Sequence, residues 1–286
     1  MTDVEGALGR AGATVSALAR ACHPAPTVAV TVFATVLAVT AGNPAGTCAL
    51  LAAAVLAGQL SIGWSNDRLD AARDLSVGRT DKPLAQGELT LRGADTAIAA
   101  ALAATIVFSL ALGWRAGLLH LFAVACGWIY NLGVKSTWWS WLAYAAAFGA
   151  LPGVATFALA AHPAPAPWVV AAGALLGITA NLTNPLPELD ADEATGIRGL
   201  AHRLGARPSL LLAAVLAVAA SVLIISGPAG APQTLAWVGL AVDIAAAAVG
   251  LRLAWPRPAS HVAFYGLMGV VAINVVLIAL IGDHLH

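Results

Sequence analysis

The sequence predicts an all-α integral membrane protein, a single bundle of about nine transmembrane helices that encloses a lipophilic cavity. Of its 286 residues, 60% are hydrophobic and only 10% are charged, whereas soluble domains carry about 25% charged residues. A water-soluble fold of this composition would lack a polar surface. Long apolar runs recur along the chain and are continuous and rich in Ala and Leu, which favours helices over the alternating strands of a β-barrel.

A helix that crosses about 30 Å of hydrocarbon needs about 20 mainly apolar residues. Polar breaks divide the chain into nine such runs, at residues 27–41, 46–64, 94–114, 116–132, 138–161, 168–182, 209–226, 234–255 and 259–281. We expect residues 1–286 to form one domain. Residues 1–22 contain acidic residues and two Arg before any long apolar run, so we expect an amphipathic cytoplasmic segment rather than a cleavable signal.

The basic residues predict the orientation in the membrane. If the N-terminus is cytoplasmic, thirteen of the fourteen Lys and Arg fall on that side, and only Arg115, between the third and fourth runs, falls on the other. Basic residues concentrate on the cytoplasmic side of membrane proteins. We therefore expect a cytoplasmic N-terminus and place His286 on the opposite side.

The net charge and the cysteine spacing give no support for nucleic-acid binding or for a cysteine metal site. The formal net charge is zero, so nothing indicates nucleic-acid binding. Cys22, Cys48 and Cys126 lack the spacing of metal ligands, and we expect buried, unreactive thiols.

Acidic residues cluster in two stretches that share one pattern. Four of the fourteen lie within residues 67–81 and four within 188–193, after the second and sixth runs, which places both stretches on the cytoplasmic side. Spacing by four stacks side chains on one face of a helix, so each stretch is expected to present an amide and two carboxylates in one direction. The repeated residues are Asn66, Asp70, Asp74 and Gly78, and Asn184, Glu188, Asp192 and Gly196.

This pattern indicates a magnesium and diphosphate site. Stacked carboxylates repel one another, and Mg²⁺ is typically held by one or two carboxylates together with substrate phosphates. Basic side chains that could bind phosphate oxygens accompany both stretches. They are Arg73, Arg79 and Lys82 near the first stretch and Arg198 and Arg203 near the second, and Lys135 follows the fourth run on the same side of the membrane.

The first stretch resembles a known motif. Asn66-Asp67-Arg68-Leu69-Asp70-Ala71-Ala72-Arg73-Asp74 is similar to the NDxxDxxxD motif of the UbiA superfamily of intramembrane prenyltransferases. The second family motif, DxxxD, is matched by Glu188-Leu189-Asp190-Ala191-Asp192, with Glu188 where the family usually has Asp. The longer side chain moves the ligand oxygens outward, and Asp190 could share or replace its role. Tyr130 with Lys135 resembles the family's tyrosine-lysine element.

The resemblance implies magnesium-dependent transfer of an isoprenyl group from a prenyl diphosphate to a lipophilic, aromatic acceptor. It implies that Mg²⁺ is held by the catalytic residues Asn66, Asp70, Asp74, Glu188 and Asp192. It also implies that the prenyl diphosphate contacts Asp67, Arg73, Arg79, Lys82, Tyr130, Lys135 and Arg198. Membrane lipid would surround the bundle, and the hydrocarbon chain of the substrate would lie inside it.

Two other functions remain open from the sequence. A membrane-bound terpene cyclase would use the same diphosphate site without a second substrate, and a transporter would use the acidic pairs as ion sites. Several polar side chains within the runs also have open roles. Asp243 is either functional or a hydrogen-bonded structural carboxyl, and His120 either bonds a neighbouring helix or acts as a general base. Rings that could stabilise a cation include Trp128, Tyr144 and Phe148.

Overall fold

The computed structural model describes residues 2–228, 234–281 and 285. Every regular element in that part of the chain is helical. Two of the elements, η1 and η2, are short 3-10 helices. The elements in order are α1 (Thr2–Ala21), α2 (Pro24–Thr40), α3 (Ala45–Ser76), α4 (Leu91–Ala111), α5 (Trp114–Leu132), η1 (Val134–Ser136), α6 (Ser140–Phe157), α7 (Pro167–Thr183), η2 (Leu186–Glu188), α8 (Leu189–Ala194), α9 (Leu200–Leu204), α10 (Ala206–Ser226), α11 (Thr234–Ala254) and α12 (His261–Ile281).

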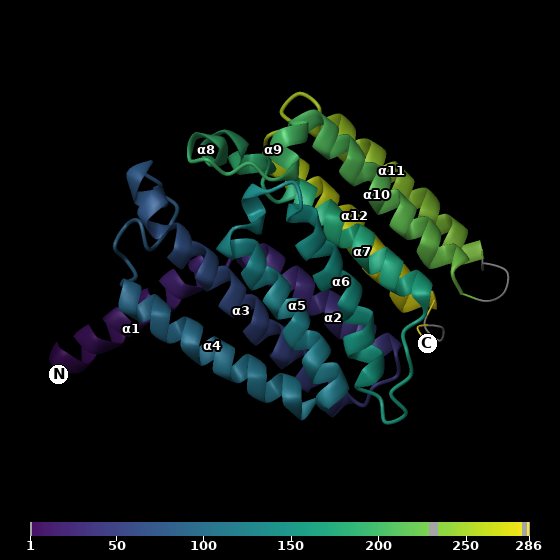
Figure 1. The fold of residues 1–286 in the computed structure, drawn as a ribbon, viewed down its shortest axis with the longest axis horizontal. Coiled ribbons are helices and arrows are strands. Elements are labelled where there is room, and N and C mark those ends of the chain that lie inside the picture. The colour runs from purple at the N-terminus through teal and green to yellow at the C-terminus, as the bar shows by residue number, and fades with distance from the viewer. Residues whose placement is uncertain (1, 229–233, 282–284, 286) are drawn as a thin grey trace.

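The long helices form one bundle (Figure 1). Neighbours in sequence pack on one another from α2 to α7, α10 packs on α7, and α12 contacts α2 as well as α10 and α11, which closes the bundle. Short helices α8 and α9 lie together at one end, outside the long helices (Figure 1). The loop after α3 reaches the same end, because Arg79 pairs with Glu188 there.

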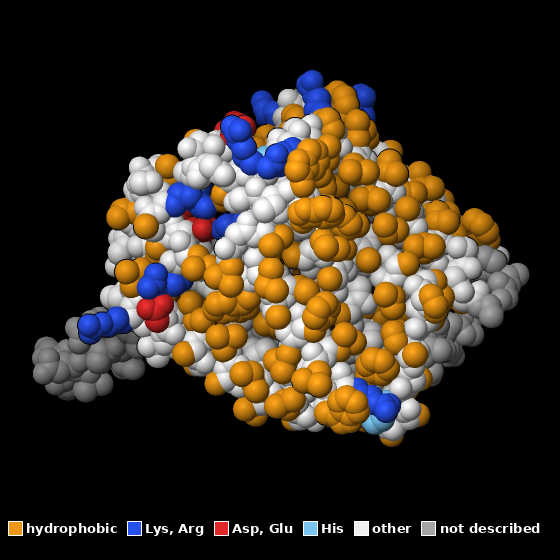
Figure 2. All heavy atoms as spheres, in the orientation of Figure 1, with side chains coloured by type: hydrophobic (Ala, Val, Ile, Leu, Met, Phe, Trp, Pro, Cys, Tyr) orange, Lys and Arg blue, Asp and Glu red, His pale blue; other side chains and the backbone are white. Residues whose placement is uncertain are grey.

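The long apolar helices identify the chain as an integral membrane protein. A helix lies at each of the nine predicted apolar runs. Within the described residues, six helices are long and apolar enough to cross a membrane, or seven if the bent α1–α2 pair forms one span, so the count of nine crossings stays a prediction. Hydrophobic side chains are spread across the face in Figure 2, and most of the charged side chains lie along its top and left side. The predicted position of His286 falls outside the described residues.

A sharp bend separates α1 from the bundle. The helical segments 12–21 and 24–40 differ in direction by 71°. His23 takes a left-handed conformation at the bend, with φ 54°, and Pro24 begins α2 because proline suits the first position of a helix. The bend packs closely on α3 at Gly63, where a Cβ would lie 2.5 Å from the carbonyl oxygen of Cys22. This bend places the His23 side chain beside Asp67 of α3.

Glycines allow α6 and α7 to pack backbone to backbone. A Cβ on Gly177 would lie 2.4 Å from the carbonyl oxygen of Tyr144, and one on Gly173 would lie 2.8 Å from that of Phe148. Gly177→Ala is expected to lower the midpoint of thermal unfolding in detergent, because overpacking against backbone costs about 1–3 kcal/mol. Gly46→Ala is the control, since a Cβ there meets nothing within 4 Å. Equal midpoints for the two variants would contradict this account of the packing.

Candidate functional site

The first acidic motif lies on the last turns of α3, which continues to Ser76. Asn66, Asp70 and Asp74 recur every four residues of this unbroken helix, so they share a face as the sequence predicts. Asp70 and Asp74 are buried. The helix ends at Ser76, Val77 caps it, and Gly78 follows with φ 70°, a left-handed conformation that favours glycine. The loop after α3 therefore turns back toward the motif.

Lys135 joins the end of α5 to this face of α3. It lies in η1, and its Nζ donates hydrogen bonds of 2.8 and 2.6 Å to the two carboxylate oxygens of Asp70. A longer bond of 3.3 Å reaches Oδ1 of Asn66. Arg73 contacts Asp70 Oδ2 at 2.7 Å and Asp74 Oδ1 at 3.9 Å. The structure thus brings predicted acidic and basic residues together in one cluster.

Asp67 points to a different side of α3 and forms a second cluster. Its side chain is 2% exposed. Oδ1 accepts a hydrogen bond of 2.8 Å from Nζ of Lys82 and lies 2.9 Å from Nε2 of His23. Oδ2 is buried without a partner in the described structure. Sequence reasoning missed His23, which is 44 residues from Asp67 and follows no helical spacing with the motif.

The second motif does not form the continuous helix that spacing by four suggested. Helix α7 ends at Thr183, a 3-10 turn covers Leu186–Glu188, and α8 is a short helix. The reason is Pro185 and Pro187, because proline lacks the N–H that an α-helix requires and restricts the residue before it. Asn184, Glu188 and Asp192 therefore do not share the face of one regular helix.

Arg79 links the two motifs across the end of the bundle. Its guanidinium donates hydrogen bonds of 2.8 and 2.7 Å to Asp81 and one of 2.7 Å to Oε1 of Glu188. These bonds from Arg79 lower the pKa of the Asp81 carboxyl to about 2, and the bonds to Asp81 and Glu188 raise the pKa of Arg79. The guanidinium of Arg79 and the carboxylate of Asp81 therefore stay charged at any ordinary assay pH.

The remaining residues of the second motif have separate partners. Asp192 Oδ2 lies 3.3 Å from Nε2 of His202, whose side chain is buried. The contact lacks hydrogen-bond geometry, since both ring nitrogens of His202 are without a partner in the described structure. Arg198 pairs with Glu193 at 3.3 Å, and both are exposed, so the structure does not bring Arg198 to the first motif. Asp190 is also exposed.

The donor set fits magnesium bound together with a ligand rather than in a protein cage. Among the described residues, no three His, Cys, Asp or Glu side chains converge on a point where they could hold a metal ion. Asp70 and Glu188 instead pair with Lys135 and Arg79. Oxygen donors from one or two carboxylates, completed by phosphate oxygens and water, are the usual environment of Mg²⁺. The residues present satisfy that requirement.

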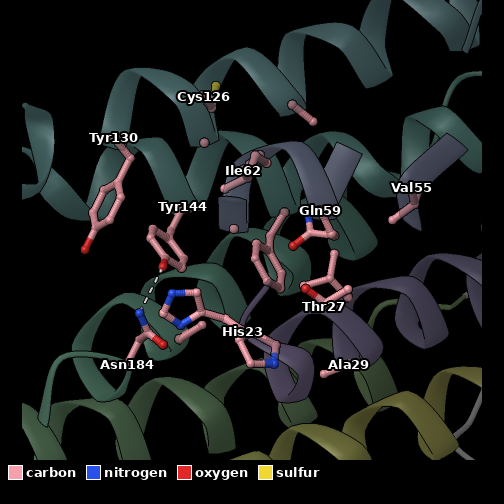
Figure 3. Close-up of a pocket in the computed structure, with 18 of the residues that line it drawn as sticks. His23, Thr27, Ala29, Val55, Gln59, Ile62, Cys126, Tyr130, Tyr144 and Asn184 are labelled. Atoms are coloured by element: carbon pink, nitrogen blue, oxygen red, sulfur yellow. Dashed lines mark hydrogen bonds between the residues drawn. The ribbon is translucent and has the colours of Figure 1, made fainter. Parts of the chain in front are cut away.

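An apolar pocket extends into the bundle from this polar end. Its lining comes mainly from α2, α3, α5, α6, α7 and α12. Tyr130 and Tyr144 meet edge to face at 5.0 Å between ring centroids, and Phe148 stacks on Tyr144 at 6.3 Å and on Phe33 at 6.2 Å. Figure 3 shows Tyr144 directed toward Asn184, whose Nδ2 lies 3.5 Å from the Tyr144 hydroxyl. Four aromatic rings therefore line a path from the polar end into the pocket.

Asp243 lies apart from this site. It is fully buried between helices and accepts a hydrogen bond from Oγ of Ser221 and one of 3.4 Å from Nδ2 of Asn274. None of the three residues lines the pocket. The contacts support the structural interpretation of Asp243, as a carboxyl that joins α10, α11 and α12.

The comparison with known families decides the identity of this arrangement. A family model described as the UbiA prenyltransferase family matches residues 27–275. The chain belongs to the UbiA prenyltransferase family. The matched part of this family member includes both acidic motifs, Lys135 and most of the pocket lining, and the match confirms the family that the sequence resembles. A search of curated proteins found no match.

Solved structures show the same fold. An apo structure of a UbiA homolog from Aeropyrum pernix K1 is 24% identical and has a TM-score of 0.71, with 89% of this chain and 97% of that chain covered. A UbiA homolog from Archaeoglobus fulgidus bound to GPP and Mg²⁺ is 16% identical and has a TM-score of 0.62, with coverages of 90% and 99%. A digeranylgeranylglyceryl phosphate synthase structure is 17% identical, with a TM-score of 0.62 and coverages of 95% and 99%. At these identities the likeness establishes the fold of this UbiA family member.

Proposed function

We propose that the chain catalyses magnesium-dependent transfer of an isoprenyl group from a prenyl diphosphate to a lipophilic, aromatic acceptor, with release of diphosphate. The observation that carries the proposal is the junction of two environments. Lys135, Asp70 and Asn66 form a charged cluster, and Asn66 and Tyr130 also line the apolar pocket. An isoprenyl diphosphate has the same division into a charged head and a hydrocarbon tail.

Asn66, Asp70, Asp74, Glu188 and Asp192 would hold the Mg²⁺, which would neutralise charge on the departing diphosphate. The homolog from Archaeoglobus fulgidus solved with GPP and Mg²⁺ supports this cofactor and this class of substrate. In the described structure the carboxylates of Asp70 and Glu188 are neutralised by Lys135 and Arg79. Binding of Mg²⁺ and the prenyl diphosphate would rearrange these pairs. A carboxylate that binds Mg²⁺ would release its partner, Lys135 or Arg79, to contact the phosphates.

The basic side chains would bind the leaving group. Cleavage of the carbon–oxygen bond leaves the electron pair on diphosphate, and fixed positive charge stabilises that transfer. Lys135 and Arg73 lie at the first motif, Arg79 bridges to the second, and Lys82 lies beside Asp67. We assign all four to the diphosphate. Arg198, which is exposed beside Glu193, would need a movement of its loop to join them.

The pocket would hold the hydrocarbon chain and protect the allylic cation. Aromatic faces attract cations, and Tyr130, Tyr144 and Phe148 line the pocket next to the charged cluster. Exclusion of water prevents capture of the cation before transfer. Surrounding membrane lipid would supply both lipophilic substrates. The cytoplasmic placement of the N-terminus and of both motifs rests on the distribution of Lys and Arg.

An assay with and without acceptors tests this function. Purified protein in detergent micelles is incubated with Mg²⁺ and geranyl, farnesyl or geranylgeranyl diphosphate, and a panel of phenolic compounds is added to one set. Diphosphate release that depends on an acceptor, with formation of a prenylated product, is the expected result. Release without any acceptor, together with a cyclic product, would instead establish the cyclase alternative. Transport of a solute without diphosphate release would support the transporter alternative.

Glu188→Asp tests how the second motif is adapted. The substitution restores the usual residue of the family motif but shortens the side chain that now reaches Arg79 at 2.7 Å. We expect the affinity for Mg²⁺ to fall about 10-fold, the lower end of the cost of disturbing a ligand's support, with diphosphate release restored at high Mg²⁺. The measurement is the Mg²⁺ dependence of release, with Glu193→Asp as the control. An unchanged Mg²⁺ dependence would show that the Arg79 contact does not position Glu188.

A further inference from the structure

One polar side chain in the pocket has no partner. Gln59 lies on α3 and lines the pocket, and its amide makes no hydrogen bond with any residue that the structure describes. In Figure 3 a dashed line joins Tyr144 to Asn184, and none reaches Gln59. Amide side chains within membrane helices normally bond a neighbouring helix, because an unpaired polar group costs free energy there. The open amide of Gln59 therefore indicates a hydrogen-bonding ligand.

Other polar groups of the lining are explained by helix packing or by the charged cluster. Thr27 and Asn131 donate hydrogen bonds of 2.7 and 2.9 Å to backbone carbonyl oxygens. Nδ1 of His120 lies 2.7 Å from Oγ of Ser109, which supports a packing role for this histidine. Asn66 belongs to the charged cluster. Gln59 differs from all of them, because neither packing nor the cluster uses its amide.

Gln59 stands in line with the first acidic motif. It is seven residues before Asn66 on α3, which is about two turns, so the two side chains share one face of the helix. Seven residues correspond to about 10 Å along the helix axis. Reacting atoms lie about 3–3.5 Å apart in a productive complex. With the diphosphate held at Asn66, one aromatic ring therefore fits between C1 of the donor and the Gln59 amide.

The pocket offers the hydrocarbon chain of the donor a different wall. Phe148 stacks on both Phe33 and Tyr144, so α2 and α6 contribute a continuous row of aromatic rings. An isoprenyl chain on these rings leaves the α3 face free for the acceptor. The reverse placement would cover the Gln59 amide with hydrocarbon and leave it unpaired.

The lining offers no opposite charge to an ionised acceptor. The part of it that the structure describes contains no Lys, Arg, Asp or Glu. Its two histidines face other groups, since His23 lies beside Asp67 and His120 beside Ser109. A carboxylate bound at Gln59 would lose its hydration without gaining a cation. A hydroxyl or carbonyl group needs only the donor and the acceptor that an amide supplies.

We propose that Gln59 binds a neutral hydroxyl or carbonyl substituent on the far side of the acceptor ring, so that the enzyme selects uncharged phenols over phenols that carry a carboxylate. The proposal rests on the proposed function, because it concerns the acceptor of that same transfer. The selectivity comes from the hydrogen bond at Gln59 and from the lack of a Lys or Arg among the described lining residues.

Three phenols of similar size test the proposal. Full-length protein in micelles receives Mg²⁺, the prenyl diphosphate that gives the fastest release, and 4-hydroxybenzamide, 4-hydroxybenzoate or 4-ethylphenol. The value of kcat/KM for each acceptor is measured from acceptor-dependent diphosphate release and from the prenylated product. Wild type is expected to use 4-hydroxybenzamide at least about 10-fold better than 4-hydroxybenzoate, because a buried unpaired charge costs more than one neutral hydrogen bond contributes.

Two variants separate acceptor selectivity from folding. Gln59→Leu keeps the approximate size of the side chain and removes the amide. It is expected to lower the ratio of kcat/KM for 4-hydroxybenzamide to kcat/KM for 4-ethylphenol about 10-fold, the value of one neutral hydrogen bond. A general loss of folded protein would lower both values and leave their ratio unchanged. Gln59→Arg supplies the missing cation and is expected to shift the preference toward 4-hydroxybenzoate.

The results that would overturn this proposal differ from those that would overturn the proposed function. A wild-type preference for 4-hydroxybenzoate would contradict the proposal without the need for any variant. An unchanged ratio in Gln59→Leu protein that elutes as a single species would also overturn it, and both results would leave the transfer reaction intact. No acceptor-dependent release from wild type with any phenol would overturn the proposed function, and the role of Gln59 with it.

Discussion

Asp70→Asn is expected to reduce magnesium-dependent diphosphate release at least about 100-fold, the upper end of the loss when only the support of a metal ligand is removed. Asp70 is buried and accepts hydrogen bonds from Lys135 with both carboxylate oxygens. Asparagine has nearly the same shape but no negative charge. It therefore keeps the packing but loses the attraction for Mg²⁺ and for the ammonium group of Lys135. The measurement is the initial rate of diphosphate release at saturating prenyl diphosphate.

Asp95→Asn provides the matched control. Asp95 pairs with Arg68 on the exposed surface, where an ion pair contributes little. The control is expected to keep the wild-type rate. Both variants should elute as single species on size-exclusion chromatography, which separates a lost site from a lost fold. Wild-type release from a well-folded Asp70→Asn protein would remove Asp70 from the site.

Lys135→Met is expected to lower diphosphate release by about 100-fold or more, the cost of removing one preorganised donor to developing negative charge. Methionine retains a long apolar stem, so the change removes mainly the charge. Arg73 would still neutralise Asp70 at 2.7 Å, which favours a folded protein. The decisive readout is the rate at saturating substrate, because Lys135 is proposed to stabilise the leaving group and not only to bind it.

Two further variants show whether a lower rate in Lys135→Met reflects a specific contact. Lys135→Arg keeps the positive charge and is expected to recover part of the rate. Arg68→Met removes an exposed cation from the same helix as the first motif and is expected to change little. If Arg68→Met lowered the rate as much as Lys135→Met, the effect would reflect general surface charge rather than a specific contact.

The first motif was predictable from sequence because its geometry is local. Spacing by four specifies one face of a helix, and α3 continues without a break through Asp74. The apolar runs likewise predicted the positions of the long helices, since hydropathy reflects the medium around each segment. Lys135 was predictable only as a residue on the same side of the membrane, because its contact with Asp70 joins two helices.

Other parts of the site depend on contacts that no local pattern encodes. His23 reaches Asp67 because α1 and α2 meet at a sharp bend, and Arg79 reaches Glu188 across 109 residues of sequence. In the second motif the local signal was present in Pro185 and Pro187, but the spacing of the acidic residues favoured a helix that the prolines interrupt.

The most direct test of the central claim is the release of diphosphate from farnesyl diphosphate by purified protein in the presence of the phenolic acceptors, at increasing Mg²⁺ and in a parallel series with excess chelator. The account predicts release that saturates with Mg²⁺, stops in chelator and is at least about 100-fold lower in Asp70→Asn. Equal release with Mg²⁺ and with chelator would contradict the assignment of the acidic motifs. No release from geranyl, farnesyl or geranylgeranyl diphosphate, with or without phenolic acceptors, would contradict the proposed activity itself.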